Sequence, residues 1–257
     1  MSVARGLCAA LLTGAAIAGC TEVSTDPQVP LSLQFDSLPA LAVVVGDTMR
    51  GGDLLPARVA VNAFNSAGGV VSDSQIRLIG IDSLSVKSFR VISGVRLVGT
   101  TENSTVRIVA QAGALQSQTQ TFAVVPRPTG IGRFDADSAD SVQYDRPDTT
   151  TRFKDVRIAL FAGPTFLNGL RVRFRIVSFT DSLLDSVRIV SPTSGRTITS
   201  QLTASDAATV RLKVYAKPSR GGRGVITVEA TSRALGVDVP GSPKQFSIRL
   251  VPFTLPR

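Results

Sequence analysis

Short runs in which apolar and polar residues alternate restrict the fold of this chain more than any other feature. They recur about every 8–15 residues and are separated by Gly, Asp, Asn or Pro. In two of them, Val172 and Phe174 alternate with arginines, and Val210 and Leu212 alternate with polar residues. A period of two places the apolar side chains on one face of a strand. With no long segment of helical period, the pattern predicts an all-β fold of antiparallel strands in sandwiches.

The length of the chain and a proline-containing boundary divide these runs between two domains. The chain has 257 residues, and Pro126-Arg127-Pro128 forms a stiff boundary near its middle. We predict a leader at 1–19, a short tether at 20–30, one sandwich at 31–126 and a second at 127–257. Leu41 to Val45 is the densest apolar run of the first half.

The N-terminus has the form of an export signal. Met1 to Gly6 carries one charge, Arg5, and the apolar stretch Leu7 to Ala18 has 12 residues, too few to span a bilayer. The stretch runs into Ile17-Ala18-Gly19-Cys20. These four residues resemble the lipobox of bacterial lipoprotein signal peptides, which has an aliphatic residue, two small residues and an invariant cysteine.

The resemblance implies a role for each lipobox residue. Cys20 would receive a diacylglycerol and become the new N-terminus, while Ile17, Ala18 and Gly19 would be read by the signal peptidase. Thr21 favours the outer membrane, because an aspartate there retains enterobacterial lipoproteins in the inner membrane. We therefore expect an exported protein held to the cell envelope by lipid. The alternative is an ordinary secretion signal with a chance cysteine.

Several residue types needed for catalysis or metal binding are missing. The chain has no His and no Trp, and after the leader Cys20 is its only cysteine. This composition excludes Ser–His–Asp and Cys–His catalysis, Cys/His zinc sites and internal disulfides. We expect no cofactor, no small-molecule substrate and no enzyme activity. A hydrolase with a pair of Asp residues is the least favoured hypothesis.

The positive charge lies in the second half of the chain. Residues 20–126 hold 7 basic and 8 acidic side chains, whereas residues 127–257 hold 20 basic and 11 acidic. If two of the predicted strands are neighbours, they form a face that could bind an anionic envelope polymer. The alternative is a solvated sheet face on which long Arg stems cover apolar surface. The candidate anion-binding residues are Arg171, Arg173, Arg175, Arg211 and Lys213.

Acidic residues gather after the predicted boundary, where oxygen ligands could hold Ca²⁺ and stiffen the junction. The candidates are Asp135, Asp137 and Asp140. Their spacing departs from the EF-hand loop, in which Ala139 would stand at an acidic position, so a polar turn is the alternative.

The first half contains three recognisable motifs: Val45-Gly46-Asp47-Thr48, a strand and glycine turn from Val59 to Gly69, and the strand Thr105 to Ala110. In this order they resemble the bacterial Ig-like (Big) domains of surface proteins. Asp82 to Val86 matches a short stretch of alternating apolar residues. Residues Met49 to Pro56 interrupt the pattern as an insertion.

The second half contains a Gly-x-x-Val-x-Phe strand at Gly169 to Phe174, the segment Thr203 to Val210, and a final strand at Gly224 to Ala230. These resemble invasin-type Ig-like domains, with a loose fit at Thr203 to Val210. The two resemblances imply tandem immunoglobulin-like sandwiches. We therefore predict a non-catalytic envelope lipoprotein whose domains act as spacers or protein-interaction (adhesion) modules, with partner strands adding to exposed sheet edges. Binding of an anionic polymer through the basic domain is the alternative function.

Overall fold

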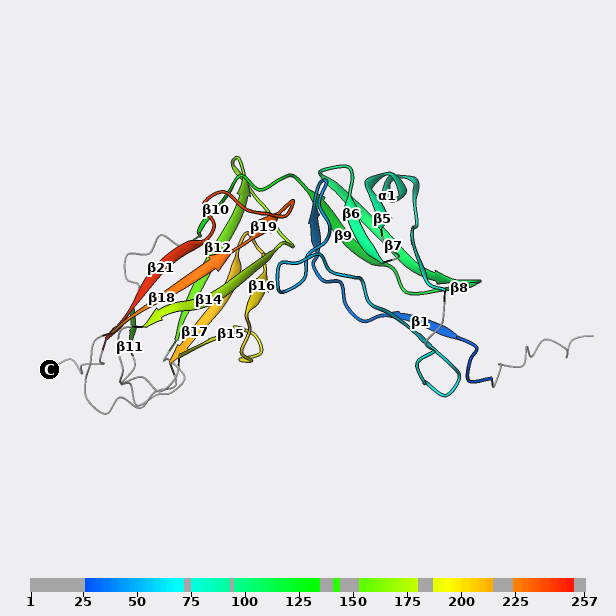
Figure 1. Cartoon of the computed structure of the whole chain (residues 1–257), viewed down its shortest axis with the longest axis horizontal. Coiled ribbons are helices and arrows are strands. Elements are labelled where there is room, and N and C mark those ends of the chain that lie inside the picture. Colours follow the sequence, from blue (N-terminus) through cyan, green and yellow to red (C-terminus); the bar gives the residue numbers. More distant parts are fainter. Residues whose placement is uncertain are drawn as a thin grey trace, which may run out of the picture.

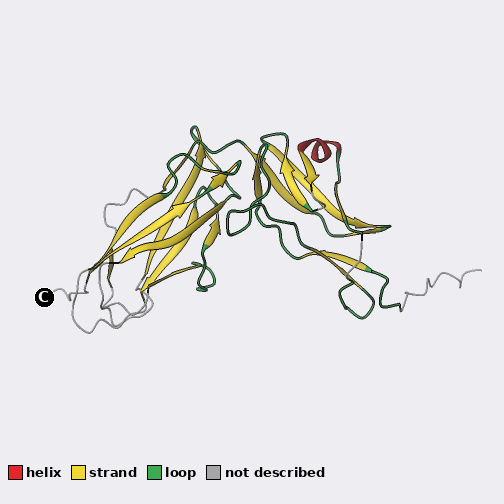
Figure 2. Ribbon diagram, viewed as in Figure 1, coloured by secondary structure: helices red, strands yellow, loops and turns green. Residues whose placement is uncertain are grey.

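The computed structural model describes residues 26–71, 75–92, 95–134, 141–143, 153–179, 187–214 and 224–251. Strands make up nearly all of the regular structure in these residues, which confirms the predicted all-β class (Figure 2). The strands form two groups of sheets, one on each side of the molecule (Figure 1). No helix in the described part of the chain is long and apolar enough to cross a bilayer.

The first group has one sheet that faces two shorter ribbons. The sheet has the order β2 (Ala42–Val44), β9 (Gln120–Val125), β7 (Ser104–Ala112) and β4 (Arg77–Gly80), with β8 (Leu115–Gln116) beside β7. The ribbons are β1 (Ser32–Phe35) with β3 (Val61–Phe64), and β5 (Phe89–Ile92) with β6 (Arg96–Gly99). Every second side chain of β7 points into the core. Val106, Ile108 and Ala110 are fully buried there, in the same cluster as Leu97 and Phe122.

The segment Asp82 to Val86, which matches a short stretch of alternating apolar residues, begins a helix. Helix α1 (Ser83–Ser88) follows β4, and Asp82 caps it by accepting a hydrogen bond from Ser85 N at 2.7 Å. This bond is the main reason that the pKa of Asp82 lies below its ordinary value. The helix packs against Gly80, where a Cβ would lie 2.9 Å from Val86 N. An N-cap aspartate outweighs the alternating pattern over so short a run.

The second group is a sandwich of two five-stranded sheets. One sheet has the order β10 (Gly130–Arg133), β12 (Phe153–Ala162), β17 (Ala208–Val214) and β15 (Val187–Val190), with β13 (Thr165–Phe166) beside β12. The other has the order β11 (Ser141–Gln143), β21 (Lys244–Val251), β18 (Gly224–Thr231), β14 (Arg171–Phe179) and β16 (Ser200–Leu202). A small hairpin of β19 (Arg233–Ala234) and β20 (Val237–Asp238) follows β18.

The core of this sandwich is built from the alternating residues that the sequence indicates. Val172 and Phe174 of β14 point into it, as do Val210 and Leu212 of β17, and all four are nearly or fully buried. The intervening residues of both strands are less buried. Each group also closes in the same way, since its early strand pairs in parallel with its last strand, β2 with β9 and β11 with β21.

Strand β2 belongs to both cores. Val43 packs in the core of the first group, whereas Ala42 and Val44, on the opposite face, pack in the core of the second. All three side chains are buried. A strand covered on both faces reads as a continuous apolar run, which explains why Leu41 to Val45 is denser than the other runs. The two sandwiches therefore meet at a packed junction.

Candidate functional site

The predicted lipidation site lies outside the described residues. Ile17, Ala18, Gly19 and Cys20 all precede residue 26, where the described part of the chain begins. The calcium candidates Asp135, Asp137 and Asp140 also lie outside it. Within the described ranges, no group of three or more His, Cys, Asp or Glu side chains could hold a metal ion.

The five predicted anion-binding residues do not share one face. Arg171, Arg173 and Arg175 lie on β14, whose neighbours are β16 and β18, while Arg211 and Lys213 lie on β17 in the opposite sheet. The outward faces of the two sheets of a sandwich point in opposite directions. The condition for a single basic patch, that the two strands be neighbours, is therefore not met.

Carboxylates from adjacent strands neutralise two of these arginines. Arg175 Nε donates to Glu229 Oε1 at 2.6 Å, and Gln245 Nε2 donates to Glu229 Oε2 at 2.9 Å. The hydrogen bond from Arg175 is the main cause that lowers the pKa of Glu229 below 4.5, and the same bond raises the pKa of Arg175. On the other sheet, Arg211 Nε donates to Asp155 Oδ1 at 2.7 Å, which raises its own pKa.

Arg171 lies at the junction rather than on an open face. Its Nε donates to the carbonyl oxygen of Pro39 at 2.8 Å, and burial lowers the pKa of its guanidinium. The side chain of Arg173, by contrast, is exposed and makes no hydrogen bond or ion pair among the described residues. It borders a polar cleft with Asp53, Glu229 and Asp238, so positive and negative groups are mixed there.

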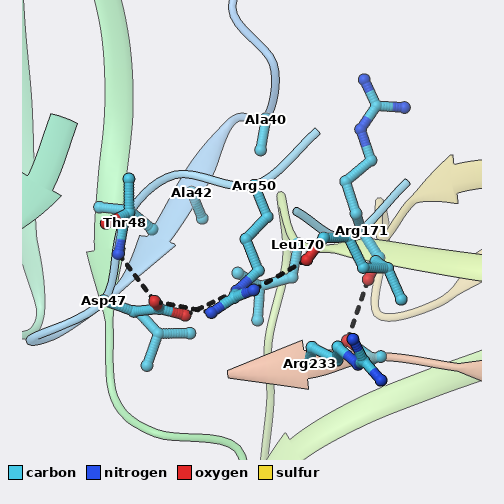
Figure 3. Close-up of a pocket in the computed structure, with 12 residues that line it drawn as sticks. Ala40, Ala42, Asp47, Thr48, Arg50, Leu170, Arg171 and Arg233 are labelled. Carbon is cyan, nitrogen blue, oxygen red and sulfur yellow. Dashed lines mark hydrogen bonds and ion pairs between the residues drawn. The ribbon is translucent and has the colours of Figure 1, made fainter. Parts of the chain in front are cut away.

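Asp47 is the most highly connected side chain of the junction (Figure 3). Its Oδ2 accepts from Arg50 Nε at 2.8 Å, its Oδ1 accepts from Arg50 Nη2 at 2.9 Å, and Thr48 N donates to Oδ1 at 2.8 Å. Oδ2 also accepts from the main-chain N–H of Leu235, in the β19–β20 turn of the second sandwich, at 2.7 Å. Asp47 is buried, with 8% of its side chain exposed, and Arg50 is nearly so, at 11%.

The loop from Met49 to Pro56, predicted as an insertion, completes this arrangement. Arg50 Nη1 donates to the carbonyl oxygen of Leu54 at 2.8 Å, which folds the loop onto Asp47. Leu54 is buried and has a φ of +65°, in the region that favours glycine. Such backbone strain persists only where surrounding contacts determine the conformation. The loop is therefore a fixed part of the junction.

Main-chain hydrogen bonds join the two sandwiches a few residues away. The carbonyl oxygen of Gly169 accepts from Leu41 N at 3.1 Å and from Ala42 N at 3.0 Å. Gly169 has a φ of +81°, and a Cβ there would lie 2.8 Å from the backbone of both Leu41 and Ala42. Only glycine allows so close an approach.

The space enclosed beside Asp47 is too small for a ligand. The pocket in Figure 3 has a volume of about 20 Å³, which is room for one water molecule. It is lined by both sandwiches, including Ala42, Asp47, Leu170 and Arg233. The arrangement around Asp47 positions two domains relative to one another, and the larger space at the junction is the polar cleft of about 280 Å³ beside Asp53 and Glu229.

The sequence contained a partial signal for this junction. Val45-Gly46-Asp47-Thr48 resembles the turn motif of an Ig-like domain, and this resemblance assigns no contact to Asp47. Its partners are separated from it by 3 residues at Arg50 and by 188 residues at Leu235. The dense apolar run before it was the one feature that could have indicated a strand buried on both sides.

No protein-family model matches the chain, and no curated protein matches its sequence. Among solved structures, the chain is similar to the Yersinia pseudotuberculosis adhesin InvE, at 11% identity and a TM-score of 0.35 over 86% of this chain and 59% of that one. It is similar to domains 5-6 of the S-layer protein SbsC at 13% identity and a TM-score of 0.30, over 88% and 99% of the two chains. It is also similar to the D00-D0 domain of intimin at 14% identity and a TM-score of 0.30, over 86% of this chain and 98% of that one. Because these TM-scores are low, the fold of this chain is described from its own sheets and strand pairings.

Proposed function

We propose that this chain is a non-catalytic, lipid-anchored protein of the cell envelope, in which two sandwiches form a stiff spacer that presents interaction surfaces away from the membrane. One observation carries the proposal of a stiff spacer: the junction between the two sandwiches is packed and buried like the interior of a single domain. β2 contributes side chains to both cores, and one buried carboxylate binds Arg50 in one sandwich and Leu235 N in the other.

The contacts at the junction support stiffness. Domains in tandem move relative to one another unless the interface between them is extensive and apolar. Here Ala42, Val44 and their neighbours Ala123 and Val125 cover the second core. Rotation of one sandwich against the other would expose these side chains to water and break the hydrogen bonds at Gly169 and Asp47.

The proposed anchor sets the direction of the spacer. The lipobox at Ile17 to Cys20 predicts lipid on Cys20, and a short stretch separates that residue from β1. The nearly neutral sandwich would then lie next to the membrane, and the sandwich with the excess of basic residues would lie outward. Stable attachment requires at least two acyl chains, as in lipoproteins that carry a diacylglycerol.

Two carboxylates of the polar cleft, Glu229 and Asp238, are held in ion pairs, which supports a role without general-acid catalysis. Glu229 is bound by Arg175 and Gln245, and Asp238 Oδ1 accepts from Arg233 Nε at 2.7 Å. The pKa of Glu229 is lowered, so it stays ionised where a general acid needs a raised pKa.

Metabolic labelling tests the anchor. Labelled palmitate should enter the parent chain, and Cys20→Ser should abolish the label and leave a precursor of full length. Cys8→Ser is the matched control, because Cys8 lies inside the apolar stretch of the leader and should not affect labelling. Label that persists in Cys20→Ser contradicts the anchor.

Distance measurements test the stiffness. Spin labels at the exposed positions Glu102 and Ser194, in a chain with Cys8→Ser and Cys20→Ser, report the separation of the two sandwiches. Pulsed electron resonance should give one narrow distance distribution, and Asp47→Ala should broaden it. Asp238→Ala, which breaks an exposed ion pair within one sandwich, should leave it narrow. A broad distribution in the parent chain contradicts the spacer.

A further inference from the structure

Strand β1 has one edge on which its main-chain groups are free. In an antiparallel pair, successive residues point their N–H and C=O groups alternately toward and away from the partner strand. The main-chain N–H and C=O of Ala63 in β3 point away from β1, because the carbonyl oxygen accepts a hydrogen bond from Val71 N at 2.8 Å. Leu33 lies opposite Ala63 in the register, so its main-chain N–H and C=O must point away from β3. The same holds for the main-chain groups of Phe35, two residues further along the strand.

A groove borders this free edge. It has a volume of about 510 Å³ and is lined by Ser32, Leu33, Gln34, Phe35, Gln118 and Gln120. Gln118 and Gln120 come from the segment that enters β9, in the sheet that faces β1. Among the described residues, none donates to or accepts from the outward main-chain groups of Leu33 and Phe35. The groove thus has hydrogen-bonding groups on one wall and side-chain amides on the other.

We propose that this groove binds an extended, uncharged peptide segment of a partner protein, which adds as a strand beside β1. The inference goes beyond the proposed function, because the groove lies on the sandwich proposed to lie next to the membrane and not on the outward surfaces that the spacer presents. Leu33 and Phe35 each offer one N–H and one C=O, so an added strand gains four main-chain hydrogen bonds. A row of unpaired edge groups is the usual template for such addition.

The lining determines the chemistry of the segment. None of the six lining residues is charged, so the groove offers no counter-ion to a charged side chain or a phosphate. A strand beside β1 would point every second side chain toward Gln118 and Gln120. Those positions favour small hydrogen-bonding residues such as Thr, Ser or Asn, which the amides can satisfy.

Residue-resolved amide exchange tests the inference on the full-length Cys20→Ser chain. The probe is the peptide acetyl-Thr-Val-Thr-Val-Thr-Val-Thr-amide, which can present Thr or Val side chains to the amides. In the free protein, Leu33 and Phe35 should exchange faster than Ser32 and Gln34, which bond to β3. The peptide should slow Leu33 and Phe35 by at least about tenfold and leave Ser32 and Gln34 unchanged.

Two neighbouring substitutions provide the matched control. Gln118→Lys places a charge in the groove and should abolish the protection, since an inward charge blocks strand addition. Thr119→Lys adds the same charge at an exposed neighbour that does not line the groove, and protection should persist.

Three outcomes overturn the inference: no protection by the peptide, equal protection in Gln118→Lys, or protection that rises with protein concentration without peptide. The third outcome would assign the edge to a second copy of the chain. None of these outcomes alters palmitate labelling or the distance distribution, so failure of the groove and failure of the spacer are distinguishable.

Discussion

Asp47 is the residue on which the junction depends most, because its one carboxylate accepts hydrogen bonds from both sandwiches. Asp47→Asn keeps the shape of the side chain and removes its charge, which leaves Arg50 buried without a counter-ion. Breaking a buried pair in this way costs about 3 kcal/mol. Denaturant unfolding should show a loss of that size in the free energy of unfolding.

The control for Asp47 is an ion pair in solvent. Arg233 and Asp238 are 43% and 40% exposed, and exposed pairs contribute less than about 1 kcal/mol. Asp238→Asn should therefore change the free energy of unfolding little. Equal losses in the two variants would show that Asp47 is no more important than a surface residue.

Glu229 should make the stability of the chain depend on pH. Its pKa is lowered in the folded state, chiefly by the hydrogen bond from Arg175, so the folded chain holds the ionised form more strongly than the unfolded chain does. The contribution is complete above the ordinary pKa of 4.5 and is lost as the pH falls through the lowered folded value. Unfolding followed from pH 7 to pH 3 should show a smaller acid loss in Glu229→Gln than in the parent.

At the scale of elements, the close approach of β2 to the second sandwich depends on Gly169. Gly169→Ala places a Cβ 2.8 Å from the backbone at Leu41 and Ala42, in addition to the strain of a positive φ. Gly163→Ala has the same kind of φ, +57°, with no atom near its Cβ. Thermal unfolding should show a cost of about 1 kcal/mol for Gly163→Ala and a clearly larger one for Gly169→Ala. Equal costs would mean that backbone strain alone operates at Gly169.

Strand faces could be predicted from the sequence because they depend on local alternation. Val172 and Phe174 on β14, and Val210 and Leu212 on β17, are buried as the period of two indicates. The order of strands in a sheet is a non-local property, and alternation alone could not show that β14 and β17 lie in different sheets.

Two further features escaped the sequence pattern for different reasons. Helix α1 is too short for helical periodicity to appear, and its one signal was the N-cap at Asp82. The junction depends on contacts between Asp47 and the turn at Leu235, which lie far apart in the chain. The spacing of basic residues also does not reveal that Arg175 is paired with Glu229 and Arg211 with Asp155.

For the whole molecule, the shared strand β2 should couple the unfolding of the two sandwiches. Val43 packs in one core and Val44 in the other, so loss of either core exposes β2 to water. We expect one calorimetric transition in which the calorimetric and van't Hoff enthalpies agree. Val43→Ala and Val44→Ala should each lower that single transition, at a cost of about 2 kcal/mol for each buried side chain that is shortened.

Val44→Asp tests the source of this coupling. The substitution places an unpaired charge against the second core and should drive β2 off that core. The single transition should then divide into two, one for each sandwich. Thr121→Asp, at an exposed position on the neighbouring strand β9, is the control and should keep one transition. Two transitions in the parent chain would mean that each sandwich unfolds independently, and the packed junction would then contribute orientation without cooperativity.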